Sequence, residues 1–365
     1  MTKLSGAISG LKWGKQLYYF HYLDICIYQM STHFKIITLS TNEIYEVNIR
    51  ETRTFVASEK YEKIFFTSLI HYKQGKGYTL FALTLKDKSL KKVPILTINS
   101  YEHINLFISA DENYLDIITA DGYVYKVCIS TLQRDDIMDL QALDTNRFFQ
   151  PWDLSRVDID RESFDSKKDY EDFLMRWFYV PDQWFNTEDN MYETYVIRGE
   201  NNDNSFTKLE LDISRNKFEI LPKNHYFKQK DFRFSTGFTF CKKSNLWTYQ
   251  LFNKVKGKYR IICVINKNDS YFCHFEITTN NNYFYSKMHE LNENQILFHF
   301  TDVLYLCDVA NKSVKAIKIK QGKAMDICFY HEIGYIIPLY FAYKKSKAYY
   351  TINDFEDTDI VVECN

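Results

Sequence analysis

The chain has 365 residues, of which 25% are charged and 45% hydrophobic, and its formal net charge is −1. A near-neutral chain has no overall field that would hold nucleic acid or an anionic membrane, so composition predicts neither as a partner. Aromatic residues reach 17%. Such residues are enriched in β-strands, because flat, stiff rings pack well on a pleated surface.

The first residues of the chain and its apolar runs contain no targeting or membrane signal. Residues 1–16 carry three lysines but no apolar stretch of signal-peptide length. The longest apolar run, 333–343, is too short to span a bilayer and contains Pro338. The eight cysteines form no CxxC pair, and a free thiol inside an apolar strand behaves as a small hydrophobe. We therefore expect a cytoplasmic protein without membrane contact, cofactor or bound metal.

Three segments share one pattern: a short apolar strand, a polar turn and an alternating strand with Tyr at the equivalent place. They run over 36–49, 117–129 and 297–309, and the turn is one residue longer in the first. The anchors Tyr45, Tyr125 and Tyr305 are 80 and 180 residues apart, which is about two and four periods of 40–45 residues. That period is typical of a four-stranded propeller blade.

A blade of this kind cannot bury both of its faces alone, so copies must stack, and closing them into a ring removes most exposed edges. A β-sandwich also has many short strands but rarely uses this much chain at this spacing. Over about 17–130 and 192–363 the sequence resembles the WD40-like β-propeller superfamily in pattern. It has no Trp-Asp dipeptide and no Gly-His opening, and with only 11 glycines Asn, Asp and Ser must supply most turns.

The resemblance implies a binding platform more often than catalysis. We expect an all-β chain that forms a β-propeller of about 6–7 degenerate four-stranded blades, as a single domain over residues 1–365. Residues 130–190 interrupt the pattern, and we interpret them as a charged, partly helical insertion between blades. A helix is predicted over 165–179, where Phe173, Leu174, Trp177 and Phe178 form one apolar stripe, and a shorter helix is predicted near 132–143.

The insertion is acidic, with 15 Asp or Glu against 7 Lys or Arg, and it holds three of the five tryptophans. Trp bears much of the binding energy at interfaces, because it buries a large area and keeps a polar group. These rings either form a contact surface for a protein partner or anchor the insertion onto a blade. The candidate protein-binding residues are Trp152, Trp177, Trp184, Phe185, Asp135 and Asp136.

The stretch 215–260 is basic, with 12 Lys or Arg against 2 Asp or Glu, and aromatic residues are interleaved with these charges. Such a pattern serves single-stranded nucleic acid or another polyanion, with rings stacked on bases. Alternation at period two over 231–240 instead places the rings in a core and the charges in water. The candidate polyanion-binding residues are Lys228, Lys230, Arg233, Lys242 and Lys243.

No motif specifies a reaction. A Walker loop, a GxSxG elbow and an HExxH motif are missing from the sequence, and the adjacent Cys273 and His274 point to opposite faces of a strand. Propellers also host glycosidases, for which Asp121 and Asp302 are candidates, although Asp is an ordinary turn residue. We expect no enzyme, but a scaffold subunit or an inhibitor that binds a protein. Polyanion binding and a carbohydrate-active hydrolase are the alternatives.

Overall fold

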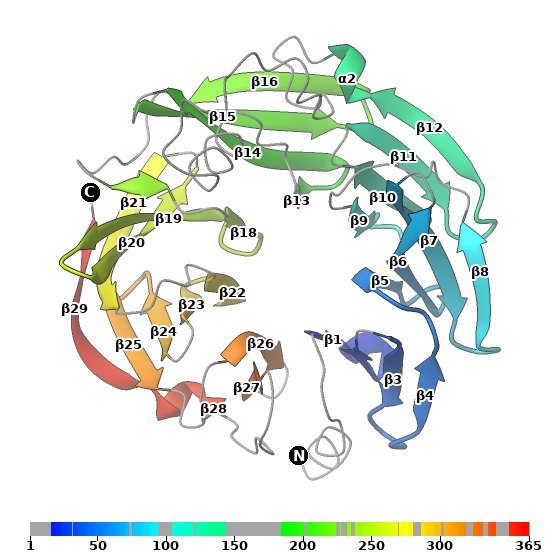
Figure 1. The fold of residues 1–365 in the computed structure, drawn as a ribbon, viewed down its shortest axis with the longest axis horizontal. Helices are drawn as coiled ribbons and strands as arrows, with labels where there is room; N and C mark the ends of the chain where they lie inside the picture. Colours follow the sequence, from blue (N-terminus) through cyan, green and yellow to red (C-terminus); the bar gives the residue numbers. More distant parts are fainter. Residues whose placement is uncertain are drawn as a thin grey trace. The chain divides into compact units, whose positions relative to one another are not determined.

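The computed structural model confirms an all-β chain (Figure 1). Among the described residues, the helical elements are the short η1 (His21–Leu23), α2 (Leu140–Leu143) and η4 (Ile352–Asp354), and no helix is long and apolar enough to cross a membrane. The structure describes residues 16–30, 32–72, 75–93, 104–119, 122–143, 184–200, 203–223, 227, 232–234, 238–268, 270–279, 286–300, 303–318, 324–330, 335–340 and 350–364.

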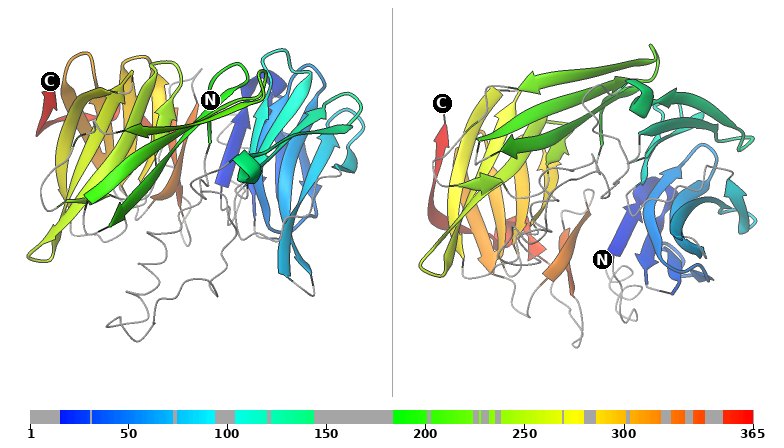
Figure 2. Two further views of the ribbon diagram at one scale, coloured as in Figure 1. Left: turned by 90° about the horizontal axis from the view of Figure 1, so that it is seen from above. Right: turned by 45° about the horizontal axis from the view of Figure 1, so that its top comes forward.

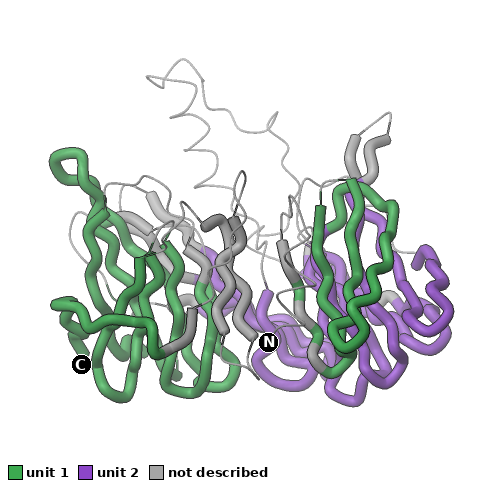
Figure 3. The backbone as a smooth tube through the Cα atoms, turned by 90° about the horizontal axis from the view of Figure 1, so that it is seen from below, with its two compact units in different colours: residues 1–52, 225–365 green, residues 53–224 purple. Residues whose placement is uncertain are grey.

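The chain divides into two compact units (Figure 3), of which unit 2 is Arg53–Asn224. Three four-stranded antiparallel sheets form unit 2, and each is a meander in chain order. Their strands are β5 (Thr52–Ser58), β6 (Lys63–Tyr72), β7 (Gly75–Thr84) and β8 (Ser89–Val93); β9 (Ile104–Ile108), β10 (Tyr114–Thr119), β11 (Tyr123–Cys128) and β12 (Arg134–Asp139); and β13 (Phe185–Glu188), β14 (Met191–Glu200), β15 (Asp203–Asp212) and β16 (Lys217–Lys223).

Unit 1 combines Met1–Thr52 with His225–Asn365. Its first sheet is a four-stranded meander, and its last is a three-stranded one. Between them lie two further meanders that the C-terminal strand β29 joins into one ten-stranded sheet. The strands are β1 (Gln16–Phe20), β2 (Ile25–Gln29), β3 (Phe34–Thr38), β4 (Ile44–Val47), β17 (Arg233–Phe234), β18 (Thr239–Cys241), β19 (Leu246–Val255), β20 (Lys258–Lys267), β21 (Ser270–Thr279), β22 (Ser286–Asn292), β23 (Gln295–Phe300), β24 (Val303–Asp308), β25 (Ser313–Lys318), β26 (Ala324–Tyr330), β27 (Tyr335–Tyr340), β28 (Tyr350–Thr351) and β29 (Glu356–Cys364).

The inner strands of these sheets are buried on both faces. Every residue of β2 is buried, and in β10 and β23 every residue after the first is buried. In the outer strands β4 and β8, by contrast, only the last residue is buried. Successive residues of a strand point to opposite faces, so an uninterrupted buried run requires a packed layer on each side of the sheet.

The sheet β9–β12 shows this arrangement directly. Ile117 of β10 packs in a core shared with β6, β7 and β8, whereas its neighbour Ile118 packs in a second core with β14 and β15. Both cores lie inside unit 2. Unit 1 has a comparable core, formed by strands β18–β25 together with Val362 of β29.

The three repeated segments each form a hairpin. Tyr45 lies opposite Ile36 and Tyr125 opposite Ile117, the first residue of each segment. Tyr305 lies opposite Phe298, the second residue of its segment, so the third hairpin is shifted by one residue. The first copy is nevertheless one strand out of phase, because Tyr45 lies on β4, a last strand, while the other two lie on the third strands β11 and β24. In the described residues β24 lies three meanders beyond β11, not the four that a uniform period predicts.

The helix predicted near 132–143 is mostly wrong. Residues 134–139 form β12, which pairs with β11, and only Leu140–Leu143 are helical. Met138 and Leu140, two residues apart, are both buried, so this segment follows the period of a strand. The helix predicted over 165–179 lies outside the described residues.

Most described tight turns are made without glycine, as the composition requires; Gly122 and Gly257 are the two described glycines with positive φ. Positive φ angles occur at Asp24, Glu62, Glu112, Asn190 and Asn245, each in the turn between the first and second strands of a sheet. Asn and Asp tolerate this conformation through local hydrogen bonds. Glu and Lys occupy as many of the described positive-φ positions as Asn and Asp do, which the sequence did not predict.

A buried carboxyl group connects two sheets of unit 2. Asp116 of β10 is 0% exposed, and its Oδ2 accepts a 2.6 Å hydrogen bond from the hydroxyl of Tyr192 on β14. Its Oδ1 accepts no hydrogen bond from any described residue. Burial raises the pKa of Asp116, and the hydrogen bond from Tyr192 only partly opposes this rise.

We predict that Asp116→Asn stabilises the protein at neutral pH. Because the pKa of Asp116 is higher in the folded chain than in the unfolded one, its contribution to stability is full below the unfolded pKa. That contribution falls by up to about 1.4 kcal/mol per pH unit as pH rises through the folded pKa. Urea unfolding from pH 4 to 8 should show the variant gaining on the wild type as pH rises. A pH-independent difference would contradict the assignment.

Candidate functional site

A carboxylate in unit 1 fixes the first turn of the preceding sheet. Glu290 of β22 accepts hydrogen bonds from the backbone N–H of Lys243 at 3.0 Å and of Ser244 at 2.7 Å. It also accepts the Ser244 hydroxyl at 2.8 Å. The turn between β18 and β19 is therefore held by three hydrogen bonds to one ionisable group, a geometry that we call a turn clasp.

The same device recurs in unit 2. Glu112, in the first turn of β9–β12, accepts the Ser58 hydroxyl at 2.6 Å and the Lys60 N–H at 2.9 Å. Asp189, in the first turn of β13–β16, accepts the N–H of Ala110 at 3.4 Å. In each case an acidic side chain accepts hydrogen bonds from the first turn of the meander that precedes it in the chain. No sequence pattern predicts these clasps, because an acidic residue at such a position is just as common when its side chain only faces solvent.

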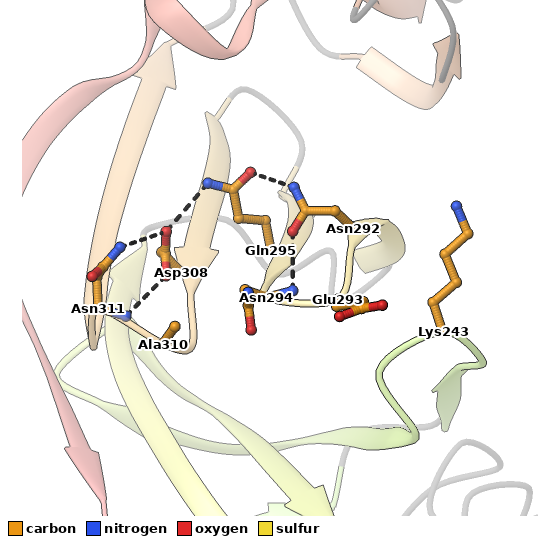
Figure 4. A pocket seen from close by; sticks show the side chains of 8 residues that line it. All are labelled: Lys243, Asn292, Glu293, Asn294, Gln295, Asp308, Ala310 and Asn311. Atoms are coloured by element: carbon orange, nitrogen blue, oxygen red, sulfur yellow. Dashed lines mark hydrogen bonds between the residues drawn. The ribbon is translucent and has the colours of Figure 1, made fainter.

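An open hollow of about 580 Å³ lies against the clasped turn of unit 1 (Figure 4). Three turns border it: β18–β19, β22–β23 and β24–β25. Amide side chains predominate in its lining, together with two carboxylates and one ammonium group. The lining residues are Lys243, Asn292, Glu293, Asn294, Gln295, Asp308, Ala310 and Asn311.

Hydrogen bonds fix the floor of this hollow. Asp308 accepts the backbone and side-chain N–H groups of Asn311 at 2.9 and 3.1 Å, and the amide of Gln295 at 3.2 Å. Gln295 in turn accepts the Asn292 amide at 2.9 Å. Burial opposes ionisation of Asp308, yet the hydrogen bonds from Asn311 and Gln295 outweigh it and lower the pKa of Asp308. The carboxylate is thus a permanent acceptor at neutral pH.

A second hollow of about 350 Å³ adjoins the first and shares Gln295, Asp308 and Asn311 with it. Asn353 and Phe355, which precede β29, also line it. We call the two hollows together the polar groove of unit 1. The groove can bind a molecule through hydrogen bonds. Its side chains provide amide donors and acceptors held in place by hydrogen bonds, an ionised carboxylate and the exposed Lys243.

The predicted acidic and aromatic site is only partly within the described residues. Trp184 is 2% exposed and packs in the core of unit 2, and its backbone N–H donates to Asn105 Oδ1 at 3.1 Å. Phe185 is half-buried on β13, and Asp135 is exposed on β12. Asp136 also lies on β12, but its side chain is not described. Trp152 and Trp177 lie outside the described residues, so a surface uniting these six stays a prediction.

The predicted polyanion-binding residues are also only partly within the described residues. Lys242 and Lys243 are exposed on the β18–β19 turn, and Lys243 lines the hollow. Arg233 lies on β17 with its side chain not described, and Lys228 and Lys230 lie outside the described residues. Asp121 and Asp302, the candidates for a hydrolase, also lie outside the described residues. Within the described part of the chain no group of three His, Cys, Asp or Glu could hold a metal ion.

No protein-family model and no curated protein matches the sequence. Among solved structures, the chain is similar to the Swd1 β-propeller domain of Myceliophteria thermophila, with a TM-score of 0.49 and 7% identity over 89% of this chain and 93% of that one. It is also similar to a eukaryotic initiation factor, with a TM-score of 0.45 and 8% identity over 89% of this chain and 81% of that one.

A third similar structure is the dihydro-heme d1 dehydrogenase NirN in complex with DHE, with a TM-score of 0.47 and 9% identity over 96% of this chain. The chain covers 66% of the length of that protein. A β-propeller domain is among the structures that the chain is similar to. The description of the fold rests on the chain's own four-stranded meanders.

We predict that Glu290→Ala lowers the free energy of unfolding by about 1–2 kcal/mol, because two backbone N–H groups and a hydroxyl lose a charged acceptor. Glu293→Ala is the matched control, since Glu293 is exposed in the adjoining turn. It should change stability by less than about 0.5 kcal/mol. Urea unfolding of both variants measures the difference, and equal effects would show that the clasp contributes nothing.

Proposed function

We propose that this chain is a non-catalytic protein-interaction module built as a WD40-like β-propeller. The successive meanders serve as blades, seven of them in the described residues, with β29 shared by two. Support comes from inner strands that are buried on both faces and outer strands that are exposed, the gradient expected of a blade. Such a module acts as a scaffold subunit or as an inhibitor of its partner.

The polar groove of unit 1 carries the proposal, because its chemistry matches a peptide chain. Asn and Gln side chains each donate and accept hydrogen bonds, as a peptide group does, so they can pair with an extended segment of a partner. The bonds from Gln295 and Asn311 to Asp308 hold these amides before a partner arrives (Figure 4). Little side-chain freedom is then lost on binding.

The acidic, Trp-bearing segment supplies a second contact region in this proposal. Its described ends belong to the sheets, as β12 and β13. A deletion of 135–188 would therefore remove two strands, and a loss of binding could then result from a folding defect. Deletion of 144–183 spares both strands and isolates the role of the segment.

We predict that Asn294→Trp lowers capture of a protein partner by at least about tenfold, a loss of about 1.4 kcal/mol, because the indole fills the hollow that the partner must enter. Glu59→Trp places the same ring on an exposed first turn of unit 2 and should leave capture unchanged. The tagged wild-type chain and both variants are compared by affinity purification from nuclease-treated extracts of the native host, with quantitative mass spectrometry.

Equal capture by all three chains would contradict the role of the groove. Loss of capture on deletion of 144–183 alone would assign binding to the acidic segment instead. Recovery of nucleic acid from untreated extract without any protein, with retention on heparin that falls steeply as salt rises, would replace protein binding by the polyanion alternative.

A further inference from the structure

The C-terminal strand β29 occupies an unusual place, between the outer edges of two meanders. Its last residues pair with β21, and its middle and first residues pair with β25 (Figures 1 and 2). The β21 side involves three residues: Val362, Glu363 and Cys364. So short a pairing contributes few backbone hydrogen bonds, and strands paired over few residues open locally more readily than long ones.

Two thiols face each other at this pairing. Cys364 of β29 is directly opposite Cys273 of β21, and both are free thiols. Directly opposed residues of antiparallel strands have Cα atoms about 4.5–5.5 Å apart. A disulfide requires about 4.4–6.8 Å, so the backbone already has the spacing of a bond. The nearby Cys364 is also one of the groups that raise the pKa of Cys273.

The neighbouring buried thiols lack such a partner in the register. Cys263 of β20 lies opposite Gln250 and Phe275, and Cys307 of β24 lies opposite Ile296 and Val314. The two thiols of the β21–β29 pair also differ in access. Cys273 is 0% exposed, whereas Cys364 is partly exposed, so a reagent meets Cys364 first.

We propose that Cys273 and Cys364 are an oxidative modification site at which a low-molecular-weight disulfide, such as oxidised glutathione, joins β29 to β21. The site lies on the β21–β29 pairing and is independent of the polar groove. Its product is a covalent bond between β29 and β21, which are otherwise joined by a three-residue pairing, by contacts of Glu363 with Tyr271 and His274, and by the burial of Val362.

The reaction proceeds by thiol–disulfide exchange. The Cys364 thiolate attacks one sulfur of oxidised glutathione, the glutathione S–S bond breaks, and one glutathione thiolate leaves. The Cys273 thiolate then attacks Sγ of Cys364, which forms the protein disulfide and releases the second glutathione. The two protons of the protein thiols end on the two glutathione thiols, and the two electrons pass to glutathione.

The second step is the slower one. Burial, with the nearby Cys307 and Cys364, raises the pKa of Cys273 strongly and keeps its thiolate scarce. Once Cys364 carries glutathione it has no thiolate charge, so one cause of that rise is removed. The slow step makes the bond a response to sustained oxidation, in keeping with the transient disulfides of reducing compartments.

The test uses the full-length reduced chain with excess oxidised glutathione under native conditions. Thiols are then trapped with N-ethylmaleimide in denaturant, and peptides are mapped by mass spectrometry. The expected product is a Cys273–Cys364 cross-link, with amide exchange in β29 slowed at least about tenfold relative to the reduced chain. Mapping of the wild-type chain decides the pairing, so the result does not depend on a variant that folds.

Cys128→Ser is the matched control. Cys128 is partly exposed and lies opposite Tyr114, and hydrogen bonds with Ser130 and Thr131 lower the pKa of Cys128 to about 7. In the wild type it should end as a glutathione adduct, and its removal should leave the cross-link intact, whereas Cys364→Ser should abolish it. Recovery of Cys364 only as a glutathione adduct, a cross-link to another cysteine, or unchanged exchange in β29 would overturn the proposal.

Discussion

The sheets of this protein are apolar on both faces, and this constraint determines the rest of the structure. Ile117 and Ile118 are neighbours on β10, yet they pack in two different cores. A sheet of this kind is stable only with a layer on each side, so the chain must repeat the meander. The exposed outer strands β4 and β8 mark where packing ends and the surface begins.

The turn clasps determine which turn of the preceding meander each meander contacts. The hydrophobic effect is non-directional, whereas Glu112 and Glu290 each accept hydrogen bonds from defined groups of one turn. In unit 1 the clasp also positions Lys243 at the rim of the polar groove. Structure and binding chemistry therefore depend on the same turn in this proposal.

The fold class was predictable because burial leaves a signal in the sequence: each repeated segment forms the hairpin that its pattern predicts. The position of a hairpin within its meander was harder to predict. Tyr45 carries the same pattern on a different strand, since a hairpin looks alike wherever it sits in a blade. Residues 130–190 lose the alternation of strands, yet the edge of β11 provides hydrogen bonds that form β12. The groove combines turns from positions 243, 292 and 311, and no local pattern predicts that meeting.

Hydrogen exchange followed by mass spectrometry tests the stacking of two-faced sheets most directly. Amides of the inner strands β2, β10 and β23 bond on both sides and lie in the core, so they should exchange only on global unfolding. The outer strands β4 and β8 should exchange orders of magnitude faster in the same experiment. Equal protection of inner and outer strands, or fast exchange in β10, would contradict the account.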